Sequence, residues 1–350
     1  MLNDARVLAT VGTIEKLRPI PDADTIEVGT VRGWDVVVKK GEYHDGDPVV
    51  YIEPDAALPL DNPVFSFLGA RSSKKIDDGD YHVLRTARLR GQVSQGIVFP
   101  AATFADAIAA TQEEGSGSGA SLDELLGIIL YEPPQPIANA NLKGPWPIAW
   151  LRKTDAERVQ NISDDFLVRV DDGLWIPTEK IDGSSITYWL DGDDLRVCSR
   201  NYELKTDDLG ATPVAVAAHY DLIALMRRNG FDAIQGELYG DNVNGNRLKA
   251  HGHHVAVFAA WSLEDGRARS RFADLAESGL PLAPVIEGLP FPTTVTQALE
   301  QADGMKSLVN PKVLAEGIVW HRVDGAGYEE TDYRDVWKAV SPRYLIKHGL

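Results

Sequence analysis

A proline-rich stretch divides the chain into two parts that differ in their pattern of apolar residues. Prolines recur at positions 133, 134, 136, 145 and 147. Proline lacks a backbone N–H and interrupts helices, so long regular elements are disfavoured there. We therefore predict an N-terminal domain over residues 1–132, a linker over 133–150 and a second domain over 151–350. The 350 residues suffice for two domains of ordinary size.

The first hundred residues have the pattern of short strands separated by turns. Runs rich in β-branched and aromatic residues occupy 7–14, 25–31, 34–38, 48–52, 81–89 and 96–99. Five or six short strands in so few residues predict a small β-barrel, for which the OB-fold is the usual candidate. The segments 14–27 and 33–38 also resemble the opening of tRNA-binding OB domains.

A short helical extension follows this predicted barrel. Residues 112–120 form a Gly- and Ser-rich segment typical of a flexible connection. Ser121 and Glu124 then have the spacing of a capping box, in which each side chain bonds to the other residue's backbone N–H. The sequence therefore predicts that a short helix begins at this point.

Composition limits the class of protein. Hydrophobic residues make up 44% of the chain and charged residues 25%, which excludes a disordered or fibrous chain. No apolar run approaches the roughly 20 residues that a membrane span needs, and the N-terminus lacks the features of a secretory signal. One cysteine, Cys198, excludes a disulfide framework and a cysteine-rich zinc site. We expect a cytoplasmic monomer with no membrane partner.

The net charge of −17 bears on nucleic-acid binding. An acidic protein is repelled by polyphosphate at long range, which argues against nonspecific coating of DNA or RNA. Only the phosphates that a protein contacts contribute to counterion release, however. The charge therefore leaves room for an enzyme that holds a short stretch of nucleic acid in a local basic groove.

The second domain has the pattern of an α+β fold with a mainly antiparallel sheet. Strand-like runs occupy 184–190, 195–200, 233–239, 255–261 and 316–322. Thr154 and Glu157 have the spacing of a second capping box, which predicts a short helix carrying Arg158. Thr212 and Gly230 bracket another predicted helix.

The residues that carry chemistry begin with the series Glu179-Lys180-Ile181-Asp182-Gly183. A Lys-x-Asp-Gly tetrad is weak evidence alone, since Lys75-Ile76-Asp77-Asp78-Gly79 has nearly the same letters. Support comes from further elements that follow in order, at strand ends or within strands: Ser199-Arg200-Asn201, Gly236-Glu237-Leu238-Tyr239-Gly240, Val257-Phe258-Ala259-Ala260-Trp261, Glu316-Gly317-Ile318-Val319 and Trp337-Lys338-Ala339-Val340.

In this order, the elements resemble the motifs of the covalent nucleotidyltransferases, which include polynucleotide ligases and RNA-capping enzymes. DNA ligases and capping enzymes place an OB domain after the terminal lysine motif, whereas here only twelve residues follow Lys338 and the predicted barrel comes first. That arrangement is similar to the Deinococcus-type RNA ligases. The resemblance includes the segment 154–161 and the tail 340–345.

The resemblance implies an ATP-dependent RNA ligase that seals 5′-phosphate and 3′-hydroxyl ends, at nicks in duplexes or at RNA ends. Lys180 would attack ATP to form lysyl-AMP, AMP would pass to the RNA 5′-phosphate, and the 3′-hydroxyl would then displace AMP. Each further site residue takes its expected role from the motif that it matches. Asp182, Glu237 and Glu316 would bind the waters of Mg²⁺ or Mn²⁺, and Arg158 would lie near the phosphates or the RNA end.

The chemistry of these residue types agrees with those roles. A free lysine, with a pKa near 10.4, is almost wholly charged at neutral pH, so a nucleophilic Lys180 needs a nearby cation and desolvation to become neutral. Mg²⁺ prefers oxygen ligands and keeps part of its hydration shell. Lys338 and Arg200 would neutralise the departing pyrophosphate. Phe258 would stack on adenine, and Glu179 belongs to the same nucleotide site.

Three further expectations concern RNA, the last motif and a histidine cluster. Basic residues of the first domain are candidate phosphate contacts, with Tyr81 as a stacking ring: Lys74, Lys75, Arg85, Arg88 and Arg90. Many ligases have a second lysine two residues after the position of Lys338, and Lys347 is a candidate substitute. His251-Gly252-His253-His254 predicts a solvated turn, because its spacing is loose for a metal site.

Two alternative functions remain open on the sequence. The first is another covalent nucleotidyltransferase, which joins DNA or uses GTP. The second is a noncatalytic RNA-binding protein built on the tRNA-binding-like barrel. The complete set of Lys180, Asp182, Glu237 and Glu316 argues against the second.

Overall fold

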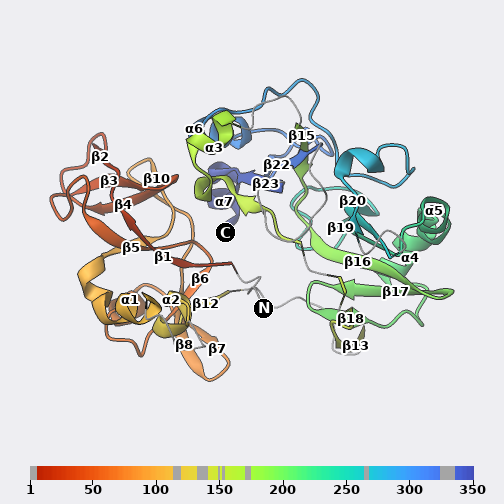
Figure 1. Ribbon diagram of the computed structural model, residues 1–350, viewed down its shortest axis with the longest axis horizontal. Coiled ribbons are helices and arrows are strands. Elements are labelled where there is room, and N and C mark those ends of the chain that lie inside the picture. Colours follow the sequence, from red (N-terminus) through yellow and green to blue (C-terminus); the bar gives the residue numbers. More distant parts are fainter. Residues whose placement is uncertain are drawn as a thin grey trace. The chain divides into compact units, whose positions relative to one another are not determined.

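The computed structural model describes residues 6–112, 120–131, 141–148, 150–151, 154–169, 175–263, 268–323 and 336–350. The chain forms two compact units, one of residues 1–135 with 345–350 and one of residues 136–344 (Figure 1). Part of the stretch predicted as a linker is regular, because β13 (Leu142–Pro145) pairs with β18 (Tyr202–Leu204). Proline is compatible with β13 because this strand is at the edge of its sheet.

The first unit consists of short strands in small antiparallel sheets, with short helices between and after the strands (Figure 1). Its strands are β1 (Ala9–Thr13), β2 (Lys16–Pro19), β3 (Ile26–Val31), β4 (Trp34–Lys39), β5 (Pro48–Ile52), β6 (Ala56–Pro59), β7 (Lys74–Ile76), β8 (Gly79–Val83), β9 (Ala87–Leu89), β10 (Gln92–Ser94), β11 (Ile97–Pro100) and β12 (Ile129–Leu130). Its helices are the 3-10 helices Ser66–Ala70 and Ala101–Phe104, α1 (Ala105–Gln112) and α2 (Leu122–Leu126). The predicted strands are all present, and 81–89 contains parts of two.

Strand β5 places the core of this unit on both of its faces. Val49 and Tyr51 belong to a cluster around Trp34, whereas Val50 and Ile52 belong to a second cluster beneath α2. Alternate side chains of a strand point to opposite faces, so this apolar run fills both clusters. The burial explains why β5 lacks the polar alternation of an exposed strand.

The capping box at α2 is confirmed. The Glu124 backbone N–H donates to Ser121 Oγ, and the Ser121 N–H donates to Glu124 Oε2 at 2.9 Å. In the same turn, the carboxylate of Asp123 accepts hydrogen bonds from the backbone of Leu8 and Ala9. These bonds attach α2 to the beginning of β1.

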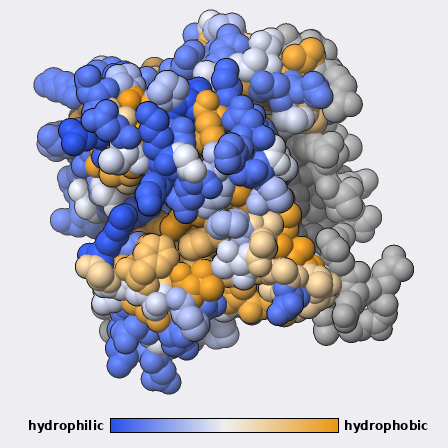
Figure 2. Space-filling view, turned by 90° about the vertical axis from the view of Figure 1, so that its left-hand side faces the viewer, coloured by the Kyte–Doolittle hydropathy of each residue, from blue (hydrophilic) through white to orange (hydrophobic). Residues whose placement is uncertain are grey.

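One face of the first unit separates polar from apolar side chains. Figure 2 shows apolar side chains gathered in the lower part of this face, at the height of α1 in Figure 1, with hydrophilic side chains above them. Ala105, Ala109 and Ala110 of α1 are exposed, as is Phe67, whose exposed fraction is 55%.

The second unit contains a seven-stranded and a four-stranded sheet. The first has the order β13, β18, β17 (Asp194–Ser199), β16 (Ser184–Asp191), β19 (Ala233–Gly240), β20 (His253–Ser262) and β21 (Ala268–Arg269). The second has the order β14 (Glu157–Arg158), β23 (Val336–Val340), β22 (Gly317–Arg322) and β15 (Trp175–Lys180). All pairs are antiparallel except β14 with β23, which agrees with the predicted α+β class.

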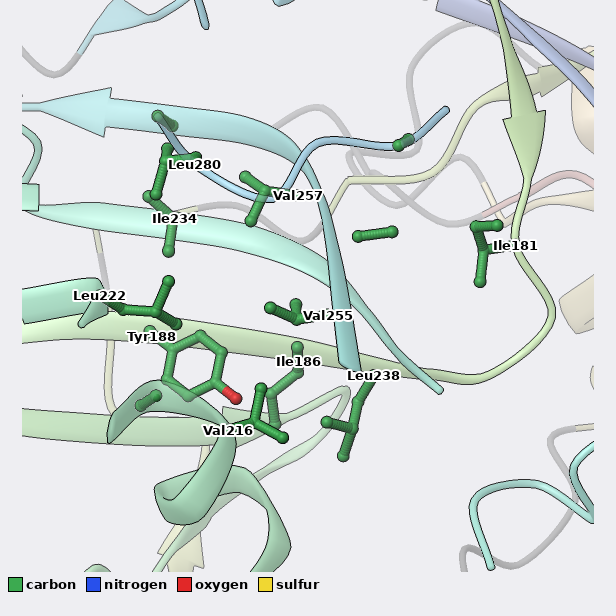
Figure 3. Packing of buried hydrophobic residues seen from close by; sticks show 14 of the residues in the cluster. Ile181, Ile186, Tyr188, Val216, Leu222, Ile234, Leu238, Val255, Val257 and Leu280 are labelled. Carbon is green, nitrogen blue, oxygen red and sulfur yellow. The ribbon is translucent and has the colours of Figure 1, made fainter. Parts of the chain in front are cut away.

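Helices α4 (Thr212–His219), α5 (Leu222–Asn229) and α6 (Val295–Ala302) pack on the sheets of this unit. The unit also contains α3 (Asp164–Arg169) and the 3-10 helices Val159–Asn161 and Phe272–Leu275, and α7 (Pro342–His348) begins in it and ends within residues 345–350 of the first unit. Tyr188, Leu222 and Ile234 pack together between α5 and the seven-stranded sheet, and Ile181 lies nearer the end of β15 (Figure 3). A second cluster, around the stacked rings of Trp320 and Trp337, joins α6 to the four-stranded sheet.

The segment 281–286 connects the two sheets of the second unit. Val257 on β20 donates to the Pro281 carbonyl and accepts from Ala283. On the other side, Glu179 on β15 donates to the Pro284 carbonyl. One extended segment therefore bonds to a strand of each sheet and fixes the end of β15 relative to β20.

Two helix predictions are wrong in detail. No helix begins at Thr154; Glu157 and Arg158 form β14, and a 3-10 turn follows. The Thr154 hydroxyl donates to Gln235, and Glu157 accepts from Arg158 N and Asn161 Nδ2. The two side chains of the expected capping box therefore bond elsewhere.

The predicted helix 212–230 is two helices, α4 and α5. Asp221 separates them in a left-handed conformation, with φ of 50°. Residues of both helices enter the same core, and the bend lets both pack on the sheet. Gly230 ends α5 with φ of 69°, as predicted. Among the described residues, no helix is long and apolar enough to cross a membrane.

We predict that Leu222→Ala lowers the free energy of unfolding by about 2–5 kcal/mol, because a fully buried side chain leaves a cavity. Leu209→Ala is the matched control, since the exposed fraction of Leu209 is 80%. Chemical denaturation of both variants measures the difference. Equal losses would show that α5 does not contribute its apolar face to the core.

Candidate active site

Lys180 lies where the two sheets of the second unit meet. It is the last residue of β15 in the four-stranded sheet, and only three residues separate it from Ser184, which begins β16 of the seven-stranded sheet. Lys180 pairs across the ladder with Gly317, so Glu316 immediately precedes its partner strand. Glu237 lies on β19 opposite Ser185. The two sheets thus bring together residues that are far apart in the sequence.

Three carboxylates surround the amine of Lys180. Its Nζ lies 2.7 Å from Glu316 Oε1, and the charges of Glu237 and Asp182 also act on it. Burial lowers the pKa of Lys180, but the attraction of these carboxylates outweighs burial and raises it. In the free protein the amine is therefore charged and paired.

The carboxylates have shifted pKa values in turn. Burial raises the pKa of Glu237 to about 8, with Glu316 and Asp182 adding to the rise and Lys180 opposing it. Burial likewise raises the pKa of Glu316, against the attraction of Lys180. Several like charges at one buried place are costly unless a cation compensates them. The site consequently favours added positive charge.

Two glycines let these groups approach. A Cβ on Gly183 would lie 2.2 Å from the Leu238 carbonyl oxygen and 3.0 Å from Glu237 Cγ. A Cβ on Gly317 would lie 2.2 Å from the Ala339 carbonyl oxygen. The glycines of the Lys-x-Asp-Gly and Glu-Gly motifs are therefore required by close packing, and neither has a left-handed backbone.

A cationic group lies along the same four-stranded sheet. Lys338 on β23 pairs with Val319 of β22 on one side and with Arg158 of β14 on the other. The Lys338 amine donates to Asp155 Oδ1 at 2.5 Å, and Arg200 Nη2 lies 4.0 Å from Asp155 Oδ2. Burial lowers the pKa of Lys338, and Lys180 and Arg158 add to this while Asp155 opposes it. Three predicted phosphate-site residues thus lie near one another.

The predicted nucleotide contacts lie on β15 itself and on β20 of the seven-stranded sheet. Glu179 is buried, and its Oε2 accepts from the Leu308 backbone N–H at 2.7 Å. Burial raises the pKa of Glu179, and hydrogen bonds from the 307–309 segment oppose the rise. Phe258 is the extra residue of a bulge in β20, since Gln235 pairs with Ala259 and Gly236 with Val257. A bulge re-aims a side chain, and Phe258 remains partly exposed.

Oxygen ligands of this kind suit a hard divalent cation. Asp182, Glu237 and Glu316 are the candidate ligands, and their mutual repulsion shows that added positive charge fits there. Within the described ranges, no three His, Cys, Asp or Glu side chains are grouped closely enough to hold a metal directly. The oxygen donors and the mutual repulsion of the three carboxylates therefore fit such a cation.

Comparison with known proteins agrees with this geometry. A model of an OB-fold domain matches residues 8–101, and the RNA ligase family model matches residues 173–340. The solved structure of a Naegleria gruberi RNA ligase variant with AMP and manganese is 32% identical, with a TM-score of 0.81, over 98% of this chain and 99% of that chain. The chain belongs to the RNA ligase family. No curated protein matches this chain.

Two further Naegleria structures show what that enzyme binds. A lysine-to-alanine variant with ATP and manganese has a TM-score of 0.80 at 32% identity, over 98% of this chain and 99% of that chain. The enzyme with pyrophosphate has the same score and identity, over 99% of both chains. The matches confirm an OB-fold followed by an RNA ligase domain.

Two residues substituted in the Naegleria variants are separated from a substituted lysine by the same number of positions as two predicted site residues are from Lys180. One aspartate variant lies two positions after the substituted lysine, as Asp182 does after Lys180. One glutamate variant lies as far after that lysine as Glu237 lies after Lys180. At these two positions, this chain has the same residue types at the same separations from a lysine.

Four residues that were not predicted from the sequence interact with predicted site residues. Asp155 bonds to Lys338, while Asn244 and Arg247 bond to the carboxylate of Asp182. Tyr344 is fully buried near Asp182, and burial followed by the charge of Asp182 raises its pKa. Asp155 and Tyr344 belong to segments included in the family resemblance, but Arg247 lies in a turn-rich stretch with no signal for its role.

The other predicted residues belong to the first unit. Lys74 donates to Tyr131 and Arg85 pairs with Asp55, both within the first unit. Lys75, Arg88 and Arg90 are exposed there. Lys347 is exposed in the last turn of α7.

The histidine cluster behaves as a hydrogen-bonded turn. His253 Nε2 bonds to the Asp241 carbonyl, and His254 bonds to the His251 carbonyl and to Tyr220. These contacts engage one ring nitrogen of His253 and both ring nitrogens of His254.

We predict that Gly183→Ala destabilises the ligase by about 1–3 kcal/mol, because the added methyl group overpacks the turn. It should also reduce RNA sealing, since the clash lies between Lys180 and Glu237. Gly144→Ala is the control, because its Cβ would meet nothing within 4 Å. Denaturation and sealing assays compare the two, and equal behaviour would contradict the packing role of Gly183.

Proposed function

We propose that this ligase seals RNA 5′-phosphate and 3′-hydroxyl ends with ATP and Mg²⁺ or Mn²⁺, through lysyl-AMP on Lys180 and RNA-adenylate. The observation that carries the proposal is the position of Lys180, between three carboxylates on one side and the Lys338 group on the other. Structures of the related Naegleria ligase with ATP, AMP and pyrophosphate support it.

The proposed chemistry has three steps. Lys180 Nζ, without its proton, bonds to the α-phosphorus of ATP as the bond to the bridging oxygen breaks and pyrophosphate leaves. The RNA 5′-phosphate then attacks the same phosphorus, and the N–P bond breaks. Finally the 3′-hydroxyl attacks the 5′-phosphate, a phosphodiester forms, and AMP leaves with the electron pair of the broken P–O bond.

The residues divide between holding charge and stabilising the leaving group. Asp182, Glu237 and Glu316 would hold the metal through its waters, and a bound cation would supply positive charge that favours the neutral amine. Lys338 and Arg200 pair with Asp155 in the structure. With Arg158 beside them, they would pair with the negatively charged phosphates of ATP instead.

The nucleotide base is proposed to lie beside Glu179 and Phe258. Glu179 Oε1 is buried and has no hydrogen-bond partner among the described residues. A buried acceptor without a donor is costly, and the exocyclic amino group of adenine would satisfy it. The aromatic ring of Phe258 supplies a stacking surface. These features suit a purine nucleotide, and the Naegleria structures with AMP and ATP support ATP as that nucleotide.

We propose that the chain is a Deinococcus-type RNA ligase, because its OB-fold precedes the ligase domain. We propose that residues 1–132 grip RNA, preferably beside a nick, and that residues 151–350 carry the chemistry. The lone cysteine, Cys198, is buried, in keeping with a cytoplasmic protein. A monomer satisfies the reaction, because all the residues invoked belong to one chain.

We predict that the ligase becomes labelled when it is incubated with Mg²⁺ and ATP radiolabelled at the α-phosphate. Lys180→Ala should abolish the label, and chelation of the metal should do the same. Lys75→Ala, within the similar Lys-x-Asp motif of the first unit, should remain labelled because no RNA takes part in this step. Gel electrophoresis measures the bound label.

Three results would contradict this assignment or redirect it. An unlabelled wild type, or equal labelling of Lys180→Ala, refutes lysyl-AMP formation at Lys180. Stronger labelling with GTP refutes the proposed base site. Nicked duplexes with either RNA or DNA at the 3′ end then decide strand preference, and efficient sealing of DNA alone refutes the RNA substrate.

We also predict that Arg88→Glu combined with Arg90→Glu weakens RNA binding, most strongly at low salt, because exposed arginines contribute through phosphate contacts. Lysyl-AMP formation should be unchanged. Lys39→Glu with Lys40→Glu makes the same change in net charge at another exposed place. If both pairs weaken RNA binding equally, net charge rather than the β9–β10 hairpin is responsible.

A further inference from the structure

The carboxylate of Asp182 is held by side chains from the loop that follows β19. Arg247 Nη1 donates to Asp182 Oδ1 at 3.0 Å and lies 3.2 Å from Oδ2. Asn244 Nδ2 donates to Oδ1 at 2.9 Å. Asp182 itself is 8% exposed. Two donors from one loop therefore fix this carboxylate before any substrate is present.

The loop 241–250 is shaped to present those two donors. Asn242, Asn244, Asn246 and Lys249 all have left-handed backbones, with φ between 44° and 62°. Such conformations persist only where the surroundings over-determine them, and they cluster at functional sites.

Hydrogen bonds within and around the loop hold these backbone conformations in place. Asn246 bonds through its side chain to both the N–H and the carbonyl of Ala250. From outside the loop, Asn310 Nδ2 donates to the carbonyl of Leu248, whose side chain is buried. The loop is thus fixed on both sides of Arg247.

Arg247 also supplies a charge that the site lacks. Asp182, Glu237 and Glu316 place three carboxylates around the one amine of Lys180. A buried carboxylate without a cation or hydrogen bonds is costly. The guanidinium of Arg247 is permanently charged and bonds to Asp182 from the loop that follows β19.

We propose that Arg247, assisted by Asn244, is a positioning residue that fixes the orientation of the Asp182 carboxylate for formation of lysyl-AMP. This inference rests on the proposed function. A carboxylate has about four lone-pair sites, and these two side chains leave Oδ2 with capacity for a further donor such as a metal-bound water. The role acts through Asp182 and not through direct contact with the phosphates.

A double-mutant cycle on the full chain tests this route. Arg247→Met should slow lysyl-AMP formation and raise the Mn²⁺ concentration for half-maximal rate, by about 10- to 100-fold, as is usual when a ligand's supporting partner is lost. Arg247→Lys retains the charge without the planar fork and should lie between. In an Asp182→Asn background, Arg247→Met should cause almost no further slowing, because coupled residues are not additive.

A control and a second measurement separate this role from folding. Arg227→Met removes another paired arginine, at a surface pair with Asp193, and should leave the rate unchanged. Bound Mn²⁺ should raise the melting temperature of the wild type, and Arg247→Met should lose most of this rise. Arg247→Lys keeps the test available if Arg247→Met does not fold.

Several results would overturn the inference. Additive effects in the cycle would show that Arg247 does not act through Asp182. A faster variant, or one that needs less Mn²⁺, would show that Arg247 competes with the ion. An unlabelled wild type would refute the proposed function and this inference with it, whereas a labelled wild type with additive effects refutes the role of Arg247 alone.

Discussion

Compensation of buried charge is the constraint on which the rest of the ligase site depends. Three ion pairs lie in the second unit near the junction of its sheets: Lys180 with Glu316, Arg247 with Asp182, and Lys338 with Asp155. Removing one partner of a buried pair leaves an uncompensated charge, which typically costs about 3–5 kcal/mol. The members of each pair come from segments far apart in the sequence, so the pairs form only when the sheets are correctly joined.

The backbone satisfies that constraint through a few close contacts. The segment 281–286 bonds to both β15 and β20, and thereby sets the end of the strand that carries Lys180. Gly183 and Gly317 have no Cβ, and a Cβ at either position would clash with the backbone of a neighbouring strand. The bulge at Phe258 changes the pairing of β20 beside Gly236 without ending the strand. The motif glycines Gly183 and Gly317 are thus needed for close packing of the strands.

How far the sequence predicts this arrangement depends on the range of the interactions. Strand periodicity and the capping box at Ser121 are local, and the structure confirms them. The box expected at Thr154 has the same spacing, but Thr154 bonds instead to Gln235 on β19, a contact that local spacing does not contain. Arg247 was missed for a similar reason, because a charged residue in an Asn- and Gly-rich stretch predicts a solvated turn. The family resemblance named Lys180, Asp182, Glu237 and Glu316 as one group, which periodicity alone does not.

The pairing in the free protein also bears on how a phosphorylated substrate enters. Under the proposed function, the triphosphate must take Lys338 and Arg200 from Asp155, whose side chain is 49% exposed. A half-exposed carboxylate regains water when it is released, so this exchange costs less than breaking a fully buried pair. Glu316 is different, since only 14% of its side chain is exposed, and it would need another positive charge when Lys180 becomes neutral. A divalent cation arriving with the nucleotide would meet that need, so the site is arranged for metal and nucleotide to bind together.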